Sequence, residues 1–231
     1  MSVLPAGLFW ARKDVPGSEY VRLSAKGGPH AGDTSRSEDR TGAGNGTGIG
    51  EGLYAQGSVV AAAPVGFVCE YELRTDPGWV TSRLDVRAQG AGWARAVRLE
   101  LAAGRWRVTA SEQGDLDSAL VAAGHARAGQ PGMEDPDLLY GAFDVDLGHS
   151  PLTNTLPIRR LGLLGSEGVA HRLSVAWVLV PSLEVVQADQ IYTAIGENRV
   201  RYASETFSAD LTLDDDGFVL DYPGLAERVG I

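Results

Sequence analysis

The sequence has little that would place it in a membrane or in a disulfide framework. It contains a single cysteine, Cys69, so no disulfide can form within the chain. The longest apolar run, LSVAWVLVP at 173–181, is about half as long as a membrane-spanning helix. No basic stretch followed by an apolar run opens the sequence. We therefore expect a cytoplasmic protein with no transmembrane segment, in which Cys69 is a small buried apolar residue.

Positive charge is also scarce. Lys and Arg number 20 against 30 Asp and Glu, which gives a net charge of -10 at pH 7. A surface that follows a phosphate backbone needs the opposite balance. We therefore expect no nucleic-acid partner.

Motifs for nucleotides, metals and nucleophilic catalysis are missing. The glycines from 42 to 52 fall on every second residue, so no register gives G-x-G-x-x-G. The Asp214–Gly217 turn fails as a calcium loop because Pro223 would stand where a bidentate Glu belongs. Ser150 lies in a GHSP segment that lacks the final glycine of a nucleophile elbow. We predict no cofactor, no metal site and no catalytic residue of these kinds.

What the sequence does contain is a repeated alternation of apolar and polar residues. In FVCEYELR, at 67–74, every second residue is apolar, as in a half-buried antiparallel strand. The pattern recurs in segments at 79–89, 94–101, 105–110, 169–180, 183–195, 198–205, 209–213 and 218–222. Helical patterns are short and occur only near 117–127 and 225–229. These features predict an all-β fold of about 10–15 strands, arranged as a strongly curved antiparallel sheet with little helix.

Two segments interrupt the strand pattern, near 25–52 and near 112–137. The first is rich in Gly, Ser and charged residues and has too few apolar side chains to offset the entropy of ordering it. Neither side of an insertion offers a complete set of strands. We therefore predict one domain, 1–231, with mobile insertions at these two places.

The segment AFDVDLGHSPLTNTLPIRRLGLLG, at 142–165, places charged groups among apolar ones. If its start is a strand, Asp144 and Asp146 project from one face about 7 Å apart. Phe143, Val145 and Leu147 then form the other, wholly apolar face. The aspartates therefore need polar partners on their side of the strand.

The returning segment raises the same problem for arginine. As a strand it would place Ile158 and Arg160 on one face and Arg159 and Leu161 on the other, so an arginine stands among apolar residues either way. A buried guanidinium is costly unless it is paired. One interpretation is a structural cluster of Asp–Arg pairs; another is a cavity that holds a ligand head group.

The chain resembles a bacterial family described as putative glycolipid-binding. The residues that carry the resemblance are DVDLGHSPLTNTLPIRRL, the Asp76, Trp79 and Arg83 spacing, Gln190-x-Tyr192, and LTLDDDGFVLDYPGL. The two insertions and the pair Ala142-Phe143 depart from the family pattern. The resemblance implies a spiral β-roll that binds a glycolipid or another amphiphile in a cavity.

The predicted ligand-binding residues follow from these motifs: Asp144, Asp146, Thr153, Asn154, Arg159, Arg160, Trp79, Arg83, Gln190 and Tyr192. Some of Trp79, Trp93, Trp106 and Trp177 would line the cavity. Two alternatives stay open. The chain could be a hydrolase-like enzyme with Asp144 and Asp146 as acid and base, or a cytosolic protein-interaction domain.

Overall fold

The computed structural model describes residues 4–25 and 52–230. The insertion expected at 25–52, with its glycine run, lies outside the described residues except at its two ends. The strands are β1 (Gly7–Arg12), β2 (Gly17–Ala25), β3 (Leu53–Ala61), β4 (Phe67–Thr75), β5 (Thr81–Gly90), β6 (Trp93–Ala102), β7 (Arg105–Gly114), β8 (Asp144–Leu147), β9 (Glu167–Val178), β10 (Val185–Gly196), β11 (Arg199–Ala203), β12 (Ser208–Leu213), β13 (Val219–Tyr222) and β14 (Ala226–Arg228). Helical turns are α1 (Leu116–Ala122), η2 (Pro136–Leu139), η3 (Pro151–Asn154) and α2 (Thr155–Arg160).

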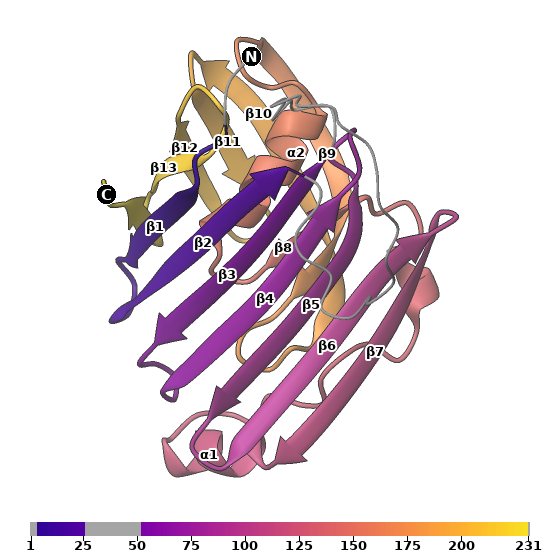
Figure 1. Cartoon of the computed structure of the whole chain (residues 1–231), viewed down its shortest axis with the longest axis vertical. Coiled ribbons are helices and arrows are strands. Elements are labelled where there is room, and N and C mark those ends of the chain that lie inside the picture. Colours follow the sequence, from indigo (N-terminus) through magenta and orange to yellow (C-terminus); the bar gives the residue numbers. More distant parts are fainter. Residues whose placement is uncertain (1–3, 26–51, 231) are drawn as a thin grey trace, which may run out of the picture.

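All fourteen strands belong to one sheet in the order β7-β6-β5-β4-β3-β2-β1-β14-β13-β12-β11-β10-β9-β8 (Figure 1). Every neighbouring pair is antiparallel except β8 and β9, which are parallel. Strand accounts for 55% of the described residues and helix for 11%, and the sheet is curved without closing on itself. The prediction of an all-β, strongly curved sheet is confirmed. No helix in the described residues is both long and apolar enough to span a bilayer.

The alternation in sequence produces these strands because one face of each is buried. In β4, Phe67, Cys69, Tyr71 and Leu73 are buried while Glu70 and Glu72 face outward. The predicted meander from β4 to β7 and the later strands β9 to β13 are confirmed. Burial raises the pKa of Cys69 to about 12, as expected of a thiol in an apolar interior.

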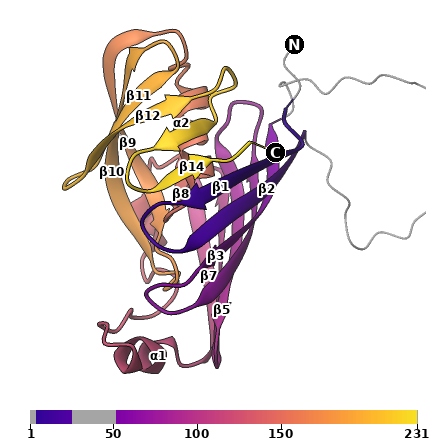
Figure 2. The ribbon, with the colours of Figure 1, turned by 90° about the vertical axis from the view of Figure 1, so that its left-hand side faces the viewer.

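The curve of the sheet encloses a core between two layers, with β2–β7 on one side and β9–β12 on the other (Figure 2). One cluster of apolar side chains joins the inner face of β1–β7 to β8 and the base of β9 and β10. A second cluster lies between α2 and β10–β13. Indole N–H groups bridge the interior: Trp106 donates to the Ala142 carbonyl at 2.9 Å and Trp10 to the Val219 carbonyl at 2.8 Å.

Two local predictions are wrong. Residues 155–160 form α2 and not a returning strand, so Arg159 and Arg160 do not face opposite ways. Pro157 is the third residue of this helix, where the backbone N–H has no intrahelical partner to lose. The helix expected near 225–229 is instead β14, because its backbone completes the ladder between β13 and β1.

Phe143 also departs from its predicted place. It lies one residue before β8 and is 46% exposed, whereas Val145 and Leu147 are buried in the core. The strand begins only at Asp144, so Phe143 does not share the apolar strand face on which it was expected with Val145 and Leu147.

The segment at 112–137 contains the end of β7, α1 and the start of η2. Asp115 caps α1 by accepting a hydrogen bond from the Ser118 N–H at 2.8 Å. The helix buries Leu116 and Leu120 against the core. These contacts give the segment an anchor on the sheet; its mobility stays a prediction.

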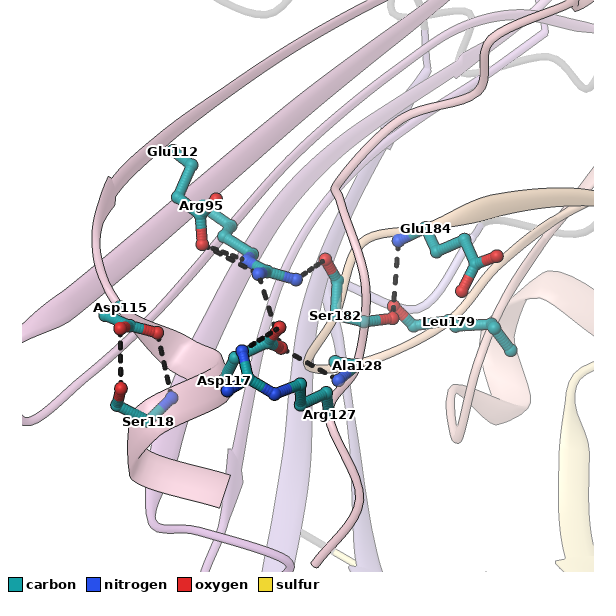
Figure 3. A network of polar contacts seen from close by, with 10 residues as sticks. All are labelled: Arg95, Glu112, Asp115, Asp117, Ser118, Arg127, Ala128, Leu179, Ser182 and Glu184. Atoms are coloured by element: carbon teal, nitrogen blue, oxygen red, sulfur yellow. Dashed lines mark hydrogen bonds and ion pairs between the residues drawn. The ribbon is translucent and has the colours of Figure 1, made fainter. Parts of the chain in front are cut away.

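A buried arginine, Arg95 on β6, connects this region to the turn between β9 and β10 (Figure 3). Its Nε and Nη2 donate to one Glu112 oxygen at 2.9 and 2.7 Å, and its Nη1 donates to the Ser182 carbonyl at 3.0 Å. Asp117 of α1 lies 3.9 Å from Nη2. One guanidinium thus holds β6, β7 and the β9–β10 turn together.

Gly57 on β3 makes room for a buried tyrosine. A Cβ at this position would lie 2.1 Å from Cζ of Tyr71, its partner on β4. The Tyr71 ring therefore crosses the β3 backbone, and its hydroxyl reaches β2.

Gly57→Ala should lower the free energy of unfolding by about 1–3 kcal/mol, since the inserted methyl group forces the Tyr71 ring from its site. Gly66→Ala is the matched control because a Cβ there meets nothing within 4 Å, and its effect should stay within about 0.5 kcal/mol. Urea denaturation of both variants measures the difference. Equal stability of the two variants would contradict the packing described for Tyr71.

Candidate functional site

Asp144, the first residue of β8, is paired with Arg160 at the end of α2. Arg160 donates from Nε to Oδ1 at 3.2 Å and from Nη2 to Oδ2 at 2.5 Å. The Asp144 residue is 1% exposed. Burial raises the pKa of Asp144, and the Arg160 guanidinium opposes that rise. The bidentate pair keeps a buried carboxylate compensated and ties α2 to β8.

Asp146, two residues further along β8, has neutral partners only. Gln190 on β10 donates to Oδ2 at 2.6 Å, and the Thr153 hydroxyl lies 3.1 Å from Oδ1. No arginine, lysine or histidine of the described residues forms an ion pair with it. Burial raises the pKa of Asp146, and the two hydrogen bonds partly offset this effect. Asp146 therefore differs from Asp144 in having no charge to balance it.

Tyr192 extends this network into the second core cluster. Its hydroxyl lies 3.0 Å from Oδ1 of Asn154 and 3.3 Å from Oε1 of Gln190. The ring packs edge-on against Tyr202, with centroids 5.4 Å apart. Five predicted site residues thus meet in one buried hydrogen-bond network: Asp146, Thr153, Asn154, Gln190 and Tyr192.

Arg159 lies on a different side of α2. Its guanidinium carbon is 5.0 Å from the centroid of the Trp79 ring, and its Nη1 donates to the Asp216 carbonyl at 3.1 Å. Trp79 adopts a left-handed backbone conformation with φ of 67°, which is uncommon for a bulky residue. The contact therefore joins the β4–β5 turn to α2 and to the β12–β13 turn.

Arg83, the remaining predicted residue, does not join these groups. It lies on the outward face of β5, where its Nε donates to Asp85 at 2.5 Å and its Nη1 to Glu100 at 3.1 Å. Sequence spacing alone had placed it with Trp79.

An open pocket of about 430 Å³ lies beside the Asp144–Arg160 pair. The pocket lies where β8 begins. β8 pairs with β9 only from Val175 to Val178. The part of β9 before Val175 has no neighbouring strand on this side among the described residues, which leaves room for the pocket. Basic side chains of α2 and β9 and apolar side chains share its lining: Arg160, Arg172 and His171, with Phe143, Leu161 and Leu173. The guanidinium carbon of Arg160 lies 5.7 Å from the Phe143 ring centroid.

The tryptophans do not line this pocket. Trp79, Trp93 and Trp106 are buried in the first core cluster, and Trp177 is partly exposed. They contribute to packing between the layers.

Comparison with known proteins decides the family. The family described as "Putative glycolipid-binding" matches residues 40–228. The chain belongs to this family. The family description applies to the segment that contains β3–β14 and therefore all the predicted site residues.

A crystal structure of a DUF1089 family protein from Pseudomonas aeruginosa has a similar fold. Its TM-score is 0.59 at 23% identity, and the similarity covers 84% of this chain and 100% of that one. At this identity the similarity speaks for the fold alone. No curated protein matches the chain.

A second polar cluster, around Glu19 of β2, was not predicted as a site. Glu19 is 1% exposed, and the hydroxyls of Tyr71 and Ser150 both donate to its Oε1, at 2.5 and 2.6 Å. Its Oε2 and the nearby Nη1 of Arg12 are buried without hydrogen-bond partners among the described residues. The sequence did carry a signal: Glu19 alternates in phase with Val21 and Leu23, which are both buried, so its side chain points to the same interior face.

The cluster fixes the chain where it leaves β8. Ser150 precedes η3, which carries Thr153 and Asn154. His149 adopts a φ of 68° and lies 3.8 Å from Asp14, which in turn pairs with Arg12. Glu19 thus supports the candidate site through the backbone of this turn. Among the described residues, no group of three or more His, Cys, Asp or Glu could hold a metal ion.

The Asp144–Arg160 pair should show strong coupling. Arg160→Ala should lower the free energy of unfolding by about 3–5 kcal/mol, since it leaves the buried Asp144 carboxylate without a partner. Asp144→Ala should cost less, because the side chain of Arg160 is 19% exposed and opens onto the pocket. The double variant should cost less than the sum by about 0.5–3 kcal/mol.

A double-mutant cycle of Asp146→Ala and Arg160→Ala is the control for that experiment. These two residues share no hydrogen bond, so their effects should be nearly additive. Chemical denaturation of all variants at pH 7 measures both cycles. Coupling of Arg160 to Asp146 rather than to Asp144 would contradict the pairing.

Glu19 should make stability depend on pH. Burial raises the pKa of Glu19 from its ordinary value of 4.5 to about 7, so the folded state holds its proton more tightly than the unfolded state. Its contribution is fully present below about pH 4.5 and is lost as the pH rises through about 7. The loss amounts to about 3 kcal/mol.

Glu19→Gln should remove that part of the pH dependence, measured by urea denaturation between pH 4 and pH 8. Glu70→Gln, on the exposed face of β4, should keep the slope of the unchanged protein. If Glu19→Gln keeps it as well, another group is responsible.

Proposed function

We propose that the chain binds an amphiphilic ligand with an anionic, sugar-bearing head group in the pocket between α2 and the free edge of β9. The observation that carries the proposal is the composition of this pocket. The guanidinium groups of Arg160 and Arg172 and the imidazole of His171 lie around one opening with the apolar side chains of Phe143, Leu161 and Leu173. A head group and the start of an apolar chain would each find a complementary surface there.

Exposed apolar side chains continue from the pocket and supply a place for the rest of the ligand. Leu138, Tyr140 and Val169 are among the most exposed large apolar residues of the described chain, at 61%, 82% and 61%. Leu138 and Tyr140 lie just before Gly141 of the pocket, and Val169 lies just before Ala170. Such side chains favour contact with an apolar partner over water.

The proposal places the ligand at the surface and not inside the roll. The tryptophans expected to line an internal cavity are packed into the core, and the pocket beside Arg160 is open. Asp144 and Asp146 have separate partners, Arg160 for one and Gln190 with Thr153 for the other, so we assign them the task of holding α2 and η3 in place. The family description is consistent with a glycolipid as ligand.

Octyl glucuronide below its micelle concentration is a suitable probe, since it combines an acidic sugar with a short apolar chain. It should bind saturably, and Arg172→Gln should weaken binding by about tenfold because a charge-assisted hydrogen bond contributes about 1.5–3 kcal/mol. Isothermal titration calorimetry measures the affinity.

Arg201→Gln is the matched control. Arg172 and Arg201 are both exposed strand arginines paired with an aspartate, Asp189 and Asp210 respectively, but Arg201 lies on β11 away from the pocket. Phe143→Ser should weaken octyl glucuronide and leave free glucuronate unaffected. Saturable binding that none of these changes alters would refute the assignment of the pocket.

A further inference from the structure

The outward face of β2–β7 carries a second hollow, far larger than the pocket beside Arg160. Its volume is about 900 Å³, and residues from all six strands line it. The strand register aligns its side chains in rows across the sheet. One row runs from Tyr20 through Ser58, Glu70, Arg87 and Ala96 to Ser111. Ser58, Ala96 and Ser111 are small, which deepens the hollow between the longer side chains of the neighbouring row.

We call this hollow the arginine trough, after the four arginines in its lining: Arg22, Arg83, Arg87 and Arg98. Only three carboxylates share the lining: Glu70, Glu72 and Asp85. This local balance is opposite to that of the whole chain, which carries a net charge of -10. The lining therefore carries one more positive than negative charge, although the chain as a whole is acidic.

The guanidinium groups of the trough have more donors than the carboxylates can satisfy. Asp85 accepts from both Arg83 and Arg98, and Arg83 also donates to Glu100 beside the trough. Arg22 donates to the amide oxygen of Gln56 at 2.7 Å, and Arg87 makes a long contact of 3.4 Å with the amide of Gln89. Within the described residues, neither Arg22 nor Arg87 forms an ion pair.

These two arginines lie on β2 and β5, three strands apart, which corresponds to about 14 Å across a sheet. Guanidinium groups bind carboxylates and phosphates through paired N–H donors. A ligand that carries two acidic groups would therefore satisfy Arg22 and Arg87 together.

The trough also presents acceptors and one aromatic ring. Glu70 and Glu72 lie between Arg22 and Arg87 in the strand order, where they would repel a ligand that is only a string of anions. They would accept hydrogen bonds from hydroxyl groups. Tyr20, 41% exposed, offers a ring face at the edge of the trough. Hydroxyls between acidic groups are the chemistry of an acidic saccharide.

We propose that the arginine trough binds a saccharide of two or more units that carries carboxylate or phosphate groups. Arg22 and Arg87 hold the acidic groups, and Glu70 and Glu72 accept from the hydroxyls between them. This site is separate from the amphiphile pocket, which lies at the other end of the sheet beside β8 and β9. The proposal does not depend on the proposed function.

Digalacturonate is the probe that tests the site, in calorimetry at low salt and with backbone NMR shifts to locate it. We expect saturable binding, shifts concentrated in β2–β6, and about tenfold weaker binding in Arg22→Gln and in Arg87→Gln, the loss expected from one charge-assisted pair. Arg201→Gln on β11 should bind as the unchanged protein does. Neither trough substitution should lower the thermal midpoint of unfolding noticeably, because neither arginine holds a carboxylate.

Two further ligands separate saccharide recognition from attraction of charge alone. A neutral dimer, maltose, should bind at least tenfold more weakly than digalacturonate, and inorganic phosphate should not compete at equal concentration. Phosphate that displaces digalacturonate at equal concentration would overturn the saccharide assignment. Absence of digalacturonate binding at millimolar concentration, or binding unchanged in both trough variants, would overturn the site.

Discussion

The interaction on which the candidate site depends is the pairing of Asp144 with Arg160. The last strand of the sheet, β8, buries Asp144 almost completely and Asp146 partly, so the first of these aspartates needs a partner from the protein. Arg160 compensates the first of them, and to do so α2 must lie against β8. The position of α2 in turn sets where Arg159 meets Trp79 and where the open pocket begins.

Arginine acts in two ways in this chain. At Arg95 a guanidinium is withdrawn from water and joins elements that are distant in sequence, and at Arg160 a partly exposed guanidinium compensates the buried Asp144 carboxylate. On the outward face of β2–β7, arginines stand in rows with fewer carboxylates than they could engage. The first group stabilises the roll. Of the second group, Arg22 and Arg87 form no ion pair within the described residues, which is the physical basis for placing a ligand on that face.

The sequence predicted the fold more successfully than the site. Alternation in segments such as 67–74 is a direct consequence of one buried face, so strands β4–β7 and β9–β13 could be located from it. The helix at 155–160 could not, because six residues with a proline show no helical period, and the contact with Asp144 decides their conformation. Arg83 was grouped with Trp79 by proximity in sequence. A single bulge near Thr75 and the direction of alternation in β5 point it to the opposite face.

Glu19 also shows that the sequence does not reveal long-range partners. Its place on an apolar phase could be read from the residues, but the partners that make it tolerable come from β4 and from the turn after β8. Those partners are 52 and 131 residues away. Pairings of that length follow from the topology of the sheet and leave no local pattern.

The position of β1 in the sheet has a consequence for the order of assembly. β1 lies between β2, its neighbour in the chain, and β14, and the indole of Trp10 reaches a carbonyl 209 residues later. In the meander β1–β7 each strand pairs with the next one in the chain, so this part can form while the rest of the chain is still being synthesised. Until β14 has been made and pairs with it, the outer edge of β1 has unpaired backbone N–H and C=O groups. Another exposed strand could form hydrogen bonds with these groups. During synthesis β1 is therefore an edge strand open to wrong pairing, although it lies in the middle of the finished sheet.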